Sequence, residues 1–294
     1  MDFGEVRSLV NTTQDEARAE AWPKLIKAMK KALKERPDEV NDVWLPYVLQ
    51  GLERWPDRLR VAPREWMNTV IRGDQVGVLM SMVTAIDADY VPNPRFQRLC
   101  ARRDVTWVRH LRFAGFKFKL ASAKALGDSE AFTNLRALEL LNISIGAHKL
   151  RAIMSGGFVE GLTDLRIARC GLGRKDLPAM FSVASFPSLA RLDLSNNFAM
   201  DVDSLEALGA ADLPSLRELD LTQSWVTSEA LDHILGASWL PQLDVLELER
   251  SYHAAYIDYG LSNEVRNERE NVAARIRDSD LRPEVAAATL RKLS

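Results

Sequence analysis

The residue types that most often perform catalysis or bind metals are few in this chain. It contains two cysteines, Cys100 and Cys170, and four histidines: His110, His148, His233 and His253. No pair of them has the spacing of a metal site, and neither a phosphate-binding glycine loop nor a nucleophile elbow is present. The histidines also fall at four different positions of a 27-residue repeat, which would place them on different surfaces. The sequence therefore predicts a protein that is not an enzyme and that uses no cofactor, metal or small-molecule substrate.

A different chemistry, recognition through charge, is suggested by residues that recur every 27 positions. The central set is Arg112, Glu139, Arg166, Asp193, Asp220 and Glu247. The set two residues earlier contains Arg191 and Glu218, and the set two residues later contains Ser195, Thr222 and Glu249. A regular spacing of this kind indicates that each set lies along one line on the surface of a repetitive fold.

The element that positions these sets is a repeat with apolar residues at offsets 0, 3 and 5. The six copies begin at Val108, Leu135, Leu162, Leu189, Leu216 and Leu243. In an extended segment, offsets 3 and 5 point to one side, and the charged offsets 2, 4 and 6 point to the other. Apolar stripes such as Leu150, Ile153 and Met154 follow with helical spacing. We therefore expect six parallel strands, each of the first five followed by a helix, centred near Leu111, Leu138, Leu165, Leu192, Leu219 and Leu246.

The pattern resembles the leucine-rich repeat, whose consensus has Asn or Cys at offset 8. Cys170 and Asn197 match it, and Ser224 and Ser251 are small polar substitutes. Phe116 and Ile143 do not match, so the first two repeats are expected to turn differently. A 27-residue unit with a helix is similar to the long class of these repeats, as in ribonuclease inhibitor and the Ran GTPase-activating proteins. The resemblance implies an α/β solenoid over residues 105–258, a right-handed horseshoe with a parallel sheet inside the curve and helices outside.

The segments on either side lack the repeat and are predicted to be helical. Residues 1–104 should form an all-α N-terminal domain, in which four of the seven tryptophans favour a packed core: Trp22, Trp44, Trp55 and Trp66. Residues 259–294 are polar and helix-prone. A solenoid has an apolar face and an open strand edge at each end, so we expect both flanks to cover these ends, with residues 259–294 as a helical C-terminal cap.

Composition disfavours several classes of protein. The net charge of −2 gives no overall field that would attract nucleic acid or an anionic membrane. The longest nearly apolar run, residues 76–86, is too short to span a bilayer and is predicted to be a buried helix. Two thiols without a recognisable secretory signal fit a reducing compartment, so a cytoplasmic protein is expected. The Ala- and Arg-rich usage favours a bacterial source.

The strand face offers a specific hypothesis about binding. Neighbouring parallel strands lie about 4.8 Å apart, so Arg112, Glu139 and Arg166 could neutralise one another, whereas Asp193, Asp220 and Glu247 could not. The predicted partner-binding residues are Arg166, Arg191, Asp193, Ser195, Glu218, Asp220, Thr222, Glu247 and Glu249, with Trp225 at the margin. Such a surface would suit a Lys- or Arg-rich segment. Alternatively, these residues are polar only because exposed strand positions usually are.

We therefore expect a non-catalytic scaffold or adaptor for protein–protein interaction, with a protein partner and no nucleic acid or membrane partner. Two alternatives remain open. The similarity to Ran GTPase-activating proteins would make the chain a regulator of an enzyme. Otherwise the N-terminal helical domain is the effector, and the repeats only dock it.

Overall fold

The structure is a computed structural model that describes residues 2–74, 77–89, 91–224, 226–249 and 262–293, with the side chains of residues 262–267 left undescribed. The chain divides into two compact bodies. The N-terminal body comprises Met1–Asp87 and Asp104–Leu111, and the repeat body comprises Ala88–Arg103 and Arg112–Ser294.

Seven strands form one sheet in the order of the sequence. They are β1 (Ala85–Asp87), β2 (His110–Ala114), β3 (Ala137–Leu141), β4 (Asp164–Ala168), β5 (Arg191–Asp193), β6 (Glu218–Asp220) and β7 (Val245–Glu247). The pairs from β3 to β7 are parallel, and their register aligns Leu138, Leu165, Leu192, Leu219 and Leu246. The six strands predicted from the repeat are thus confirmed as β2–β7.

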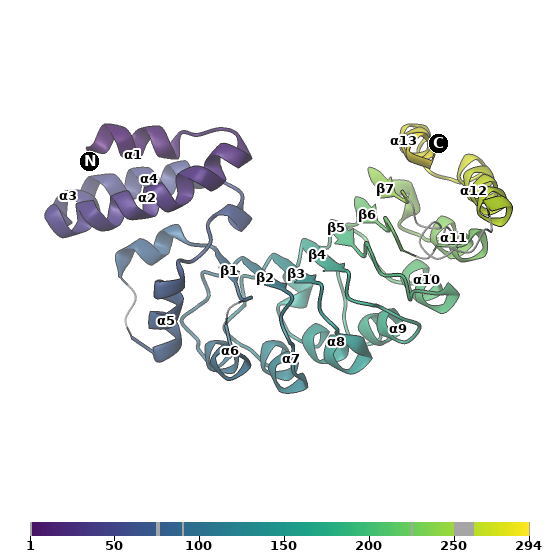
Figure 1. Ribbon diagram of the computed structural model, residues 1–294, viewed down its shortest axis with the longest axis horizontal. Helices are drawn as coiled ribbons and strands as arrows, with labels where there is room; N and C mark the ends of the chain where they lie inside the picture. Colours follow the sequence, from purple (N-terminus) through teal and green to yellow (C-terminus); the bar gives the residue numbers. More distant parts are fainter. Residues whose placement is uncertain (1, 75–76, 90, 225, 250–261, 294) are drawn as a thin grey trace. The chain divides into compact units, whose positions relative to one another are not determined.

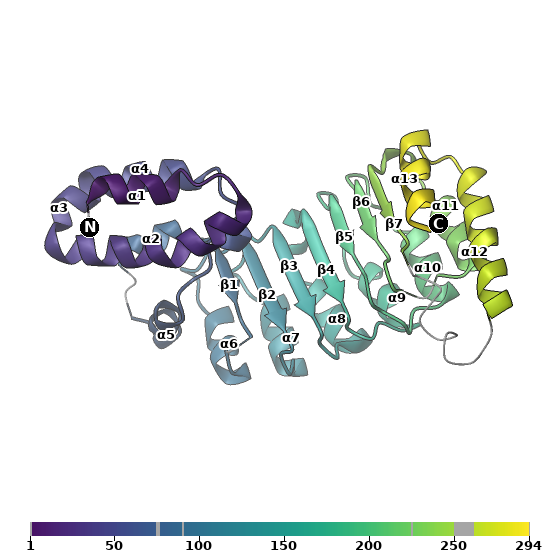
Figure 2. The ribbon, with the colours of Figure 1, turned by 45° about the horizontal axis from the view of Figure 1, so that its top comes forward.

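Helices alternate with these strands. They are α6 (Asn93–Cys100), α7 (Leu120–Gly127), α8 (Gly146–Met154), α9 (Asp176–Phe181), α10 (Val202–Gly209) and α11 (Ser228–Leu235). In the repeat body they lie side by side along the outer side of a curve whose inner side is the sheet (Figure 1), and Figure 2 shows them below the strands. The predicted stripe of Leu150, Ile153 and Met154 is at most 1% exposed, because it packs toward the strands.

One strand and one helix precede the first predicted repeat. Helix α6 begins 27 residues before α7, and Ile86 and Val91 are buried one period before Phe113 and Phe118. The backbone N–H of Ala88 donates to the carbonyl oxygen of Arg112 at 2.8 Å. The prediction of a buried helix over residues 76–86 was therefore wrong: a 3₁₀ turn, Val78–Met82, is followed by β1. Residue 76 lies outside the described residues.

The turns after β2–β6 share a left-handed backbone at one position of the repeat. The residues with positive φ recur every 27 positions: Gly115, Asn142, Arg169, Asn196 and Gln223. Each donates its N–H to a carbonyl of the following repeat, at 2.8–3.0 Å. The first two repeats share this left-handed position with the later ones. They differ in what fills the turn: in the first, Phe116 packs against Phe96, Phe113 and Phe118 with ring centroids 5.3–6.3 Å apart.

The polar residues at offset 8 hold the later turns together. Asn197 is fully buried, and its Oδ1 accepts from the N–H groups of Cys170 (2.9 Å) and Leu172 (3.2 Å). Its Nδ2 donates to the carbonyl oxygens of Ile167 and Leu194, both at 2.7 Å. One side chain thus satisfies four backbone groups that would otherwise be buried without these partners.

Two helices follow the last described strand, α12 (Ser262–Arg277) and α13 (Pro283–Leu293). The Thr289 hydroxyl donates to the carbonyl oxygen of Leu246 at 2.9 Å, and Nε of Arg282 donates to that of Leu243 at 3.0 Å. Leu246 lies in β7, the last strand of the sheet, and Leu243 lies two residues before β7 begins. Helix α13 therefore covers the edge at which another chain could otherwise add a strand.

The N-terminal body contains α1 (Phe3–Val10), α2 (Asp15–Glu35), α3 (Pro37–Glu39), α4 (Leu45–Leu52) and α5 (Arg64–Arg72). A π-helical segment, Val40–Trp44, joins α3 to α4. Trp22, Trp44 and Trp55 are at most 6% exposed, and Nε1 of Trp55 donates to the carbonyl of Val10 at 3.0 Å. Three of the four tryptophans are therefore packed in the core, as predicted, whereas Trp66 on α5 is only half-buried.

Candidate binding surface

The strand register places the predicted binding residues in columns. Arg166, Asp193, Asp220 and Glu247 lie side by side on β4–β7. The leucines next to them in sequence face the opposite side and are at most 2% exposed. Asp164, Arg191, Glu218 and Val245 form a parallel column two residues earlier.

The nine predicted residues differ in how much surface they offer. Arg166, Arg191, Glu218 and Glu249 are exposed, and Asp193, Asp220, Thr222 and Glu247 are half-buried. Ser195 is only 4% exposed, so the expectation that it contributes to the binding margin is corrected. The chain already turns away from the sheet there, and the Ser195 N–H donates to Oδ1 of Asp193 at 2.9 Å. Trp225 lies outside the described residues.

Ion pairs change the expected charge of the central column. Nε of Arg166 lies 2.6 Å from Oδ2 of Asp193, so Asp193 is neutralised, contrary to the expectation from sequence. Glu139, which was expected to take Arg166, lies instead 3.9 Å from Nε of Arg112. In the neighbouring column, Arg191 pairs with Asp164.

The other end of the column is neutralised by a residue that the sequence analysis missed. Lys292 of α13 forms an ion pair with Glu247. The two residues are 45 positions apart, and the only signal in the sequence was the basic last turn of the C-terminal helix. Glu247 was therefore wrongly expected to be without a cation.

Asp220 is the acid in this column that keeps no ion pair among the described residues. It lies between Asp193 and Glu247, and its Oδ1 accepts from the N–H of Thr222 at 2.8 Å. Burial raises the pKa of the Asp220 carboxyl, and the carboxylates on both sides raise it further. Glu218, two residues earlier on the same face of β6, also has no cation within 4 Å in the described part of the chain. The acidic surface therefore centres on β6.

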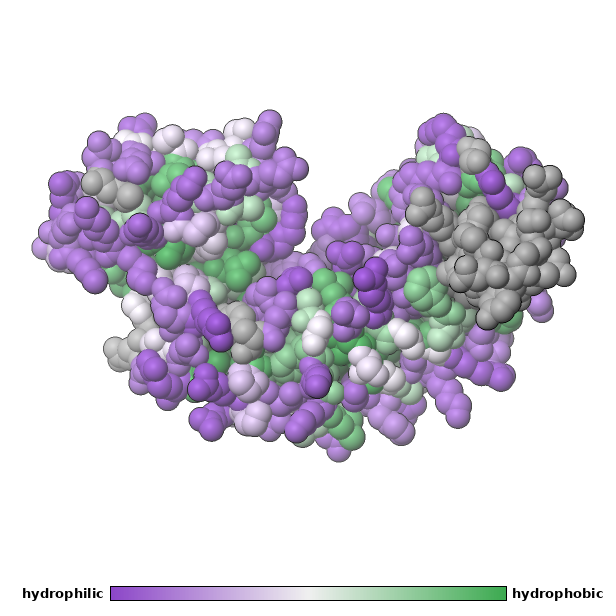
Figure 3. Space-filling model, in the orientation of Figure 1, coloured by the Kyte–Doolittle hydropathy of each residue, from purple (hydrophilic) through white to green (hydrophobic). Residues whose placement is uncertain are grey.

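The surface around this site is polar. The side chains that β4–β7 present on this face include Arg166, Asp193, Asp220 and Glu247, which are all ionisable. Figure 3 views the repeat body from another side, on which hydrophobic side chains lie between hydrophilic ones. Recognition through charge and hydrogen bonds suits such a surface better than an apolar interface does. None of the helices in the described residues is long and apolar enough to cross a membrane.

The residues considered for chemistry do not converge. Both cysteines are buried, and burial raises the pKa of each thiol, that of Cys170 to about 11. Sγ of Cys170 lies 3.1 Å from the carbonyl oxygen of Leu140, so this thiol belongs to the turn, as its offset predicted. No three His, Cys, Asp or Glu side chains in the described residues could hold a metal ion together. That the protein is not an enzyme stays a prediction.

No family model and no curated protein matches the sequence. Chains of solved structures do match. One of them, described as the crystal structure of a TLR13–ssRNA13 complex, is similar over 56% of this chain, at 18% sequence identity and a TM-score of 0.37. The matched part covers 22% of that chain, so this protein spans well under half of its length. A similarity this distant carries no argument about function. The fit to a leucine-rich-repeat solenoid rests on the parallel strands of this chain and their 27-residue spacing.

Proposed function

We propose that this protein is a non-catalytic, cytoplasmic scaffold or adaptor of bacterial origin that presents the strand face of a long-class leucine-rich-repeat horseshoe to a partner protein. The helix in every repeat supports the long, ribonuclease-inhibitor-like class. The partner contributes a Lys- or Arg-rich segment that lies across β5–β7. No small molecule, nucleic acid or membrane is required for this role.

The observation that carries the proposal is the pair of acids on β6. Glu218 and Asp220 lie on one face of one strand and have no ion pair with any residue that the structure describes, whereas Asp193 and Glu247 on either side of Asp220 each have one. The Lys292–Glu247 pair also illustrates how a lysine on a separate helix can reach this column. A partner's lysine or arginine would give Asp220 the counter-charge that its half-buried carboxylate lacks.

A matched pair of double variants tests the proposal. The probe is a short fluorescein-labelled peptide of alternating lysine and alanine, and its glutamine counterpart serves as the uncharged control. Replacing Glu218 by Gln and Asp220 by Asn should weaken binding about tenfold and flatten its salt dependence, because two screened charge contacts are lost. Glu206→Gln with Asp212→Asn makes the same charge change on exposed residues of the helical side and should bind as the unmodified protein does.

Fluorescence anisotropy over a range of salt concentrations measures both quantities. If the β6 double variant binds the lysine peptide with unchanged affinity at low salt, Glu218 and Asp220 only keep the strand face hydrated and the partner site lies elsewhere. An equal loss in both double variants would show that only net charge attracts the peptide.

A further inference from the structure

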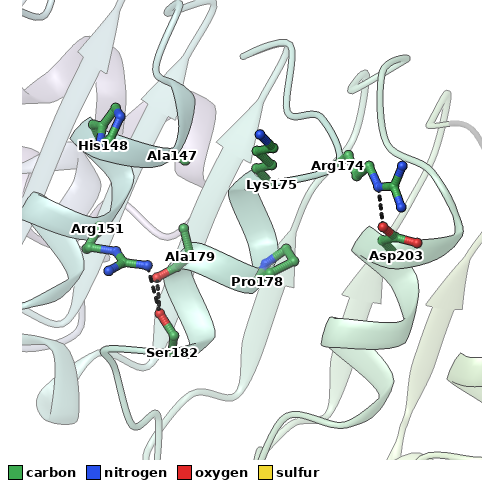
Figure 4. Close-up of a pocket in the computed structure, with 9 residues that line it drawn as sticks. All are labelled: Ala147, His148, Arg151, Arg174, Lys175, Pro178, Ala179, Ser182 and Asp203. Atoms are coloured by element: carbon green, nitrogen blue, oxygen red, sulfur yellow. Dashed lines mark hydrogen bonds and ion pairs between the residues drawn. The ribbon is translucent and has the colours of Figure 1, made fainter.

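A hollow of about 700 Å³ lies on the helical side of the repeat body, away from the strand face. Figure 4 shows that its charged residues come from three consecutive repeats. His148 and Arg151 lie on α8, Arg174 and Lys175 lie in the turn before α9, and Asp203 lies on α10. Two alanines and Pro178 supply apolar surface between these groups.

The hollow exists because α9 is short. Helix α9 has six residues, whereas α8 has nine and α10 has eight. Residues 173–175, where the repeat spacing would begin the helix, form a turn instead. The carboxylate of Asp176 holds this turn by accepting the N–H of Gly173 at 2.7 Å. The first turn of helix that would fill the space between α8 and α10 is therefore missing.

The charges that line the hollow are unbalanced. Its lining includes three Lys or Arg side chains, Arg151, Arg174 and Lys175, and a single acid, Asp203, which already pairs with Arg174. Among the described residues, Arg151 donates one long hydrogen bond, from Nη2 to the Ser182 hydroxyl at 3.4 Å, which leaves most of its guanidinium donors for other partners. Lys175 is exposed and has no acidic partner in the described part of the chain. Positive charge thus collects here although the whole chain carries a net charge of −2.

We propose that this hollow, the basic cleft of α8–α10, binds an extended acidic segment of a protein partner. The cations come from separate elements and do not point to one centre (Figure 4), which suits carboxylates spaced along a chain better than a single phosphate group. The apolar surface between them can take the methyl and methylene groups of such a segment. Nucleic acid fits less well, because tight binding to its backbone takes many more phosphate contacts than this cleft has cations. The cleft is separate from the acidic strand face and does not depend on the function proposed for that face.

The test uses the full chain and a short fluorescein-labelled peptide of alternating glutamate and alanine, with a glutamine version as the uncharged control. Arg151→Gln combined with Lys175→Gln should lower the affinity about tenfold at low salt, since two exposed charge contacts are lost. Arg98→Gln with Lys124→Gln removes the same charge from exposed residues of α6 and α7 and should leave the affinity unchanged within a factor of two.

Two further measurements test where on the protein the peptide binds and whether an acidic peptide or a nucleic acid is the better ligand. In the unmodified protein, the peptide should shift backbone amide NMR signals of residues 147–182 and not those of α6 or α7. An equal loss of affinity in both double variants, or signal shifts elsewhere, would overturn the proposal. So would a labelled single-stranded RNA that binds more tightly than the peptide and loses affinity in the Arg151/Lys175 variant.

Discussion

Replacing Asn197 by Ala should be one of the most destabilising single changes available in the repeats. The side chain is fully buried and makes four hydrogen bonds of 2.7–3.2 Å to the backbone. Two of these bonds satisfy N–H groups of the preceding turn, one satisfies the carbonyl oxygen of Ile167 in the preceding repeat, and one satisfies that of Leu194 in the same repeat. Ala would leave all four groups without this partner in a place that water does not reach.

The magnitude follows from these four bonds. Each buried hydrogen bond contributes about 0.5–1.5 kcal/mol net, and a buried group left unsatisfied costs about 1–3 kcal/mol. We therefore expect the free energy of unfolding to fall by about 3–5 kcal/mol, a large share of the roughly 5–15 kcal/mol that holds a typical domain folded.

Urea denaturation followed by far-ultraviolet circular dichroism measures this loss. The slope of the free energy of unfolding against urea concentration should be equal in the variants, which checks that unfolding exposes the same surface area. Ser224→Ala is the matched control. Its hydroxyl donates one bond to Leu194, at 2.8 Å, and accepts one from the Asn197 N–H, at 3.3 Å. It should therefore cost about 1–2 kcal/mol. Asn197→Cys, which copies Cys170 of the preceding repeat, should fall between the two.

The ranking, rather than any single value, tests the reasoning. If Asn197→Ala costs less than about 1 kcal/mol, or no more than Ser224→Ala, then the four backbone groups find other partners. The turn would in that case be held by its left-handed backbone and by burial alone.

Three further predictions concern packing, thiols and pH. Gly127→Ala should lower the stability by at least about 2 kcal/mol and the melting temperature accordingly, because the new Cβ would lie 1.9 Å from a main-chain oxygen of α8; Gly157→Ala, with nothing within 4 Å, should change neither. Cys100 and Cys170 should resist a thiol reagent at neutral pH until urea unfolds the chain, because raised pKa values keep both protonated; rapid labelling of the folded protein would contradict this. Burial raises the pKa of Asp220 in the folded state, so folding disfavours its ionised form. The contribution of this carboxyl to the free energy of unfolding of the wild-type protein therefore falls as pH rises from 3.8 through the folded-state pKa. Asp220→Asn should accordingly be the more stable protein at pH 7, with the difference vanishing below the ordinary value of 3.8, and a pH-independent difference would refute the cause.

The arrangement of the strands could be predicted from local pattern alone. The leucines at offsets 3 and 5 are buried on the same side of the strand. Because side chains alternate along an extended chain, this decides which side every neighbouring residue faces. That requirement holds whatever surrounds the segment, so the positions of β2–β7 and of the helices between them followed from the spacing. The roles of Cys170 and Asn197 in the turn were implied by the resemblance to the leucine-rich-repeat consensus and not by the apolar spacing.

The apolar pattern did not identify the strand in which a polar residue takes the buried position of a repeat leucine. Immediately before β1, Thr84 occupies the position of a repeat leucine, and it is buried with its hydroxyl donating to the carbonyl oxygen of Asp57 at 3.2 Å. A polar residue with a buried partner does not look apolar in the sequence, so the first strand was missed. The left-handed turn position was hidden likewise, since it is filled by residues as different as Gly115 and Arg169.

The charge of the binding surface was decided only by tertiary structure. Arg166 has an acid on each neighbouring strand, and the choice of Asp193 over Glu139 depends on side-chain geometry that spacing does not contain. Lys292 reaches Glu247 because α13 folds back over the last strand. The basic cleft likewise depends on where α9 begins within its repeat. Burial of leucine is a property of one segment and its solvent, whereas an ion pair or a hollow requires two or more segments to be placed to within an ångström or so.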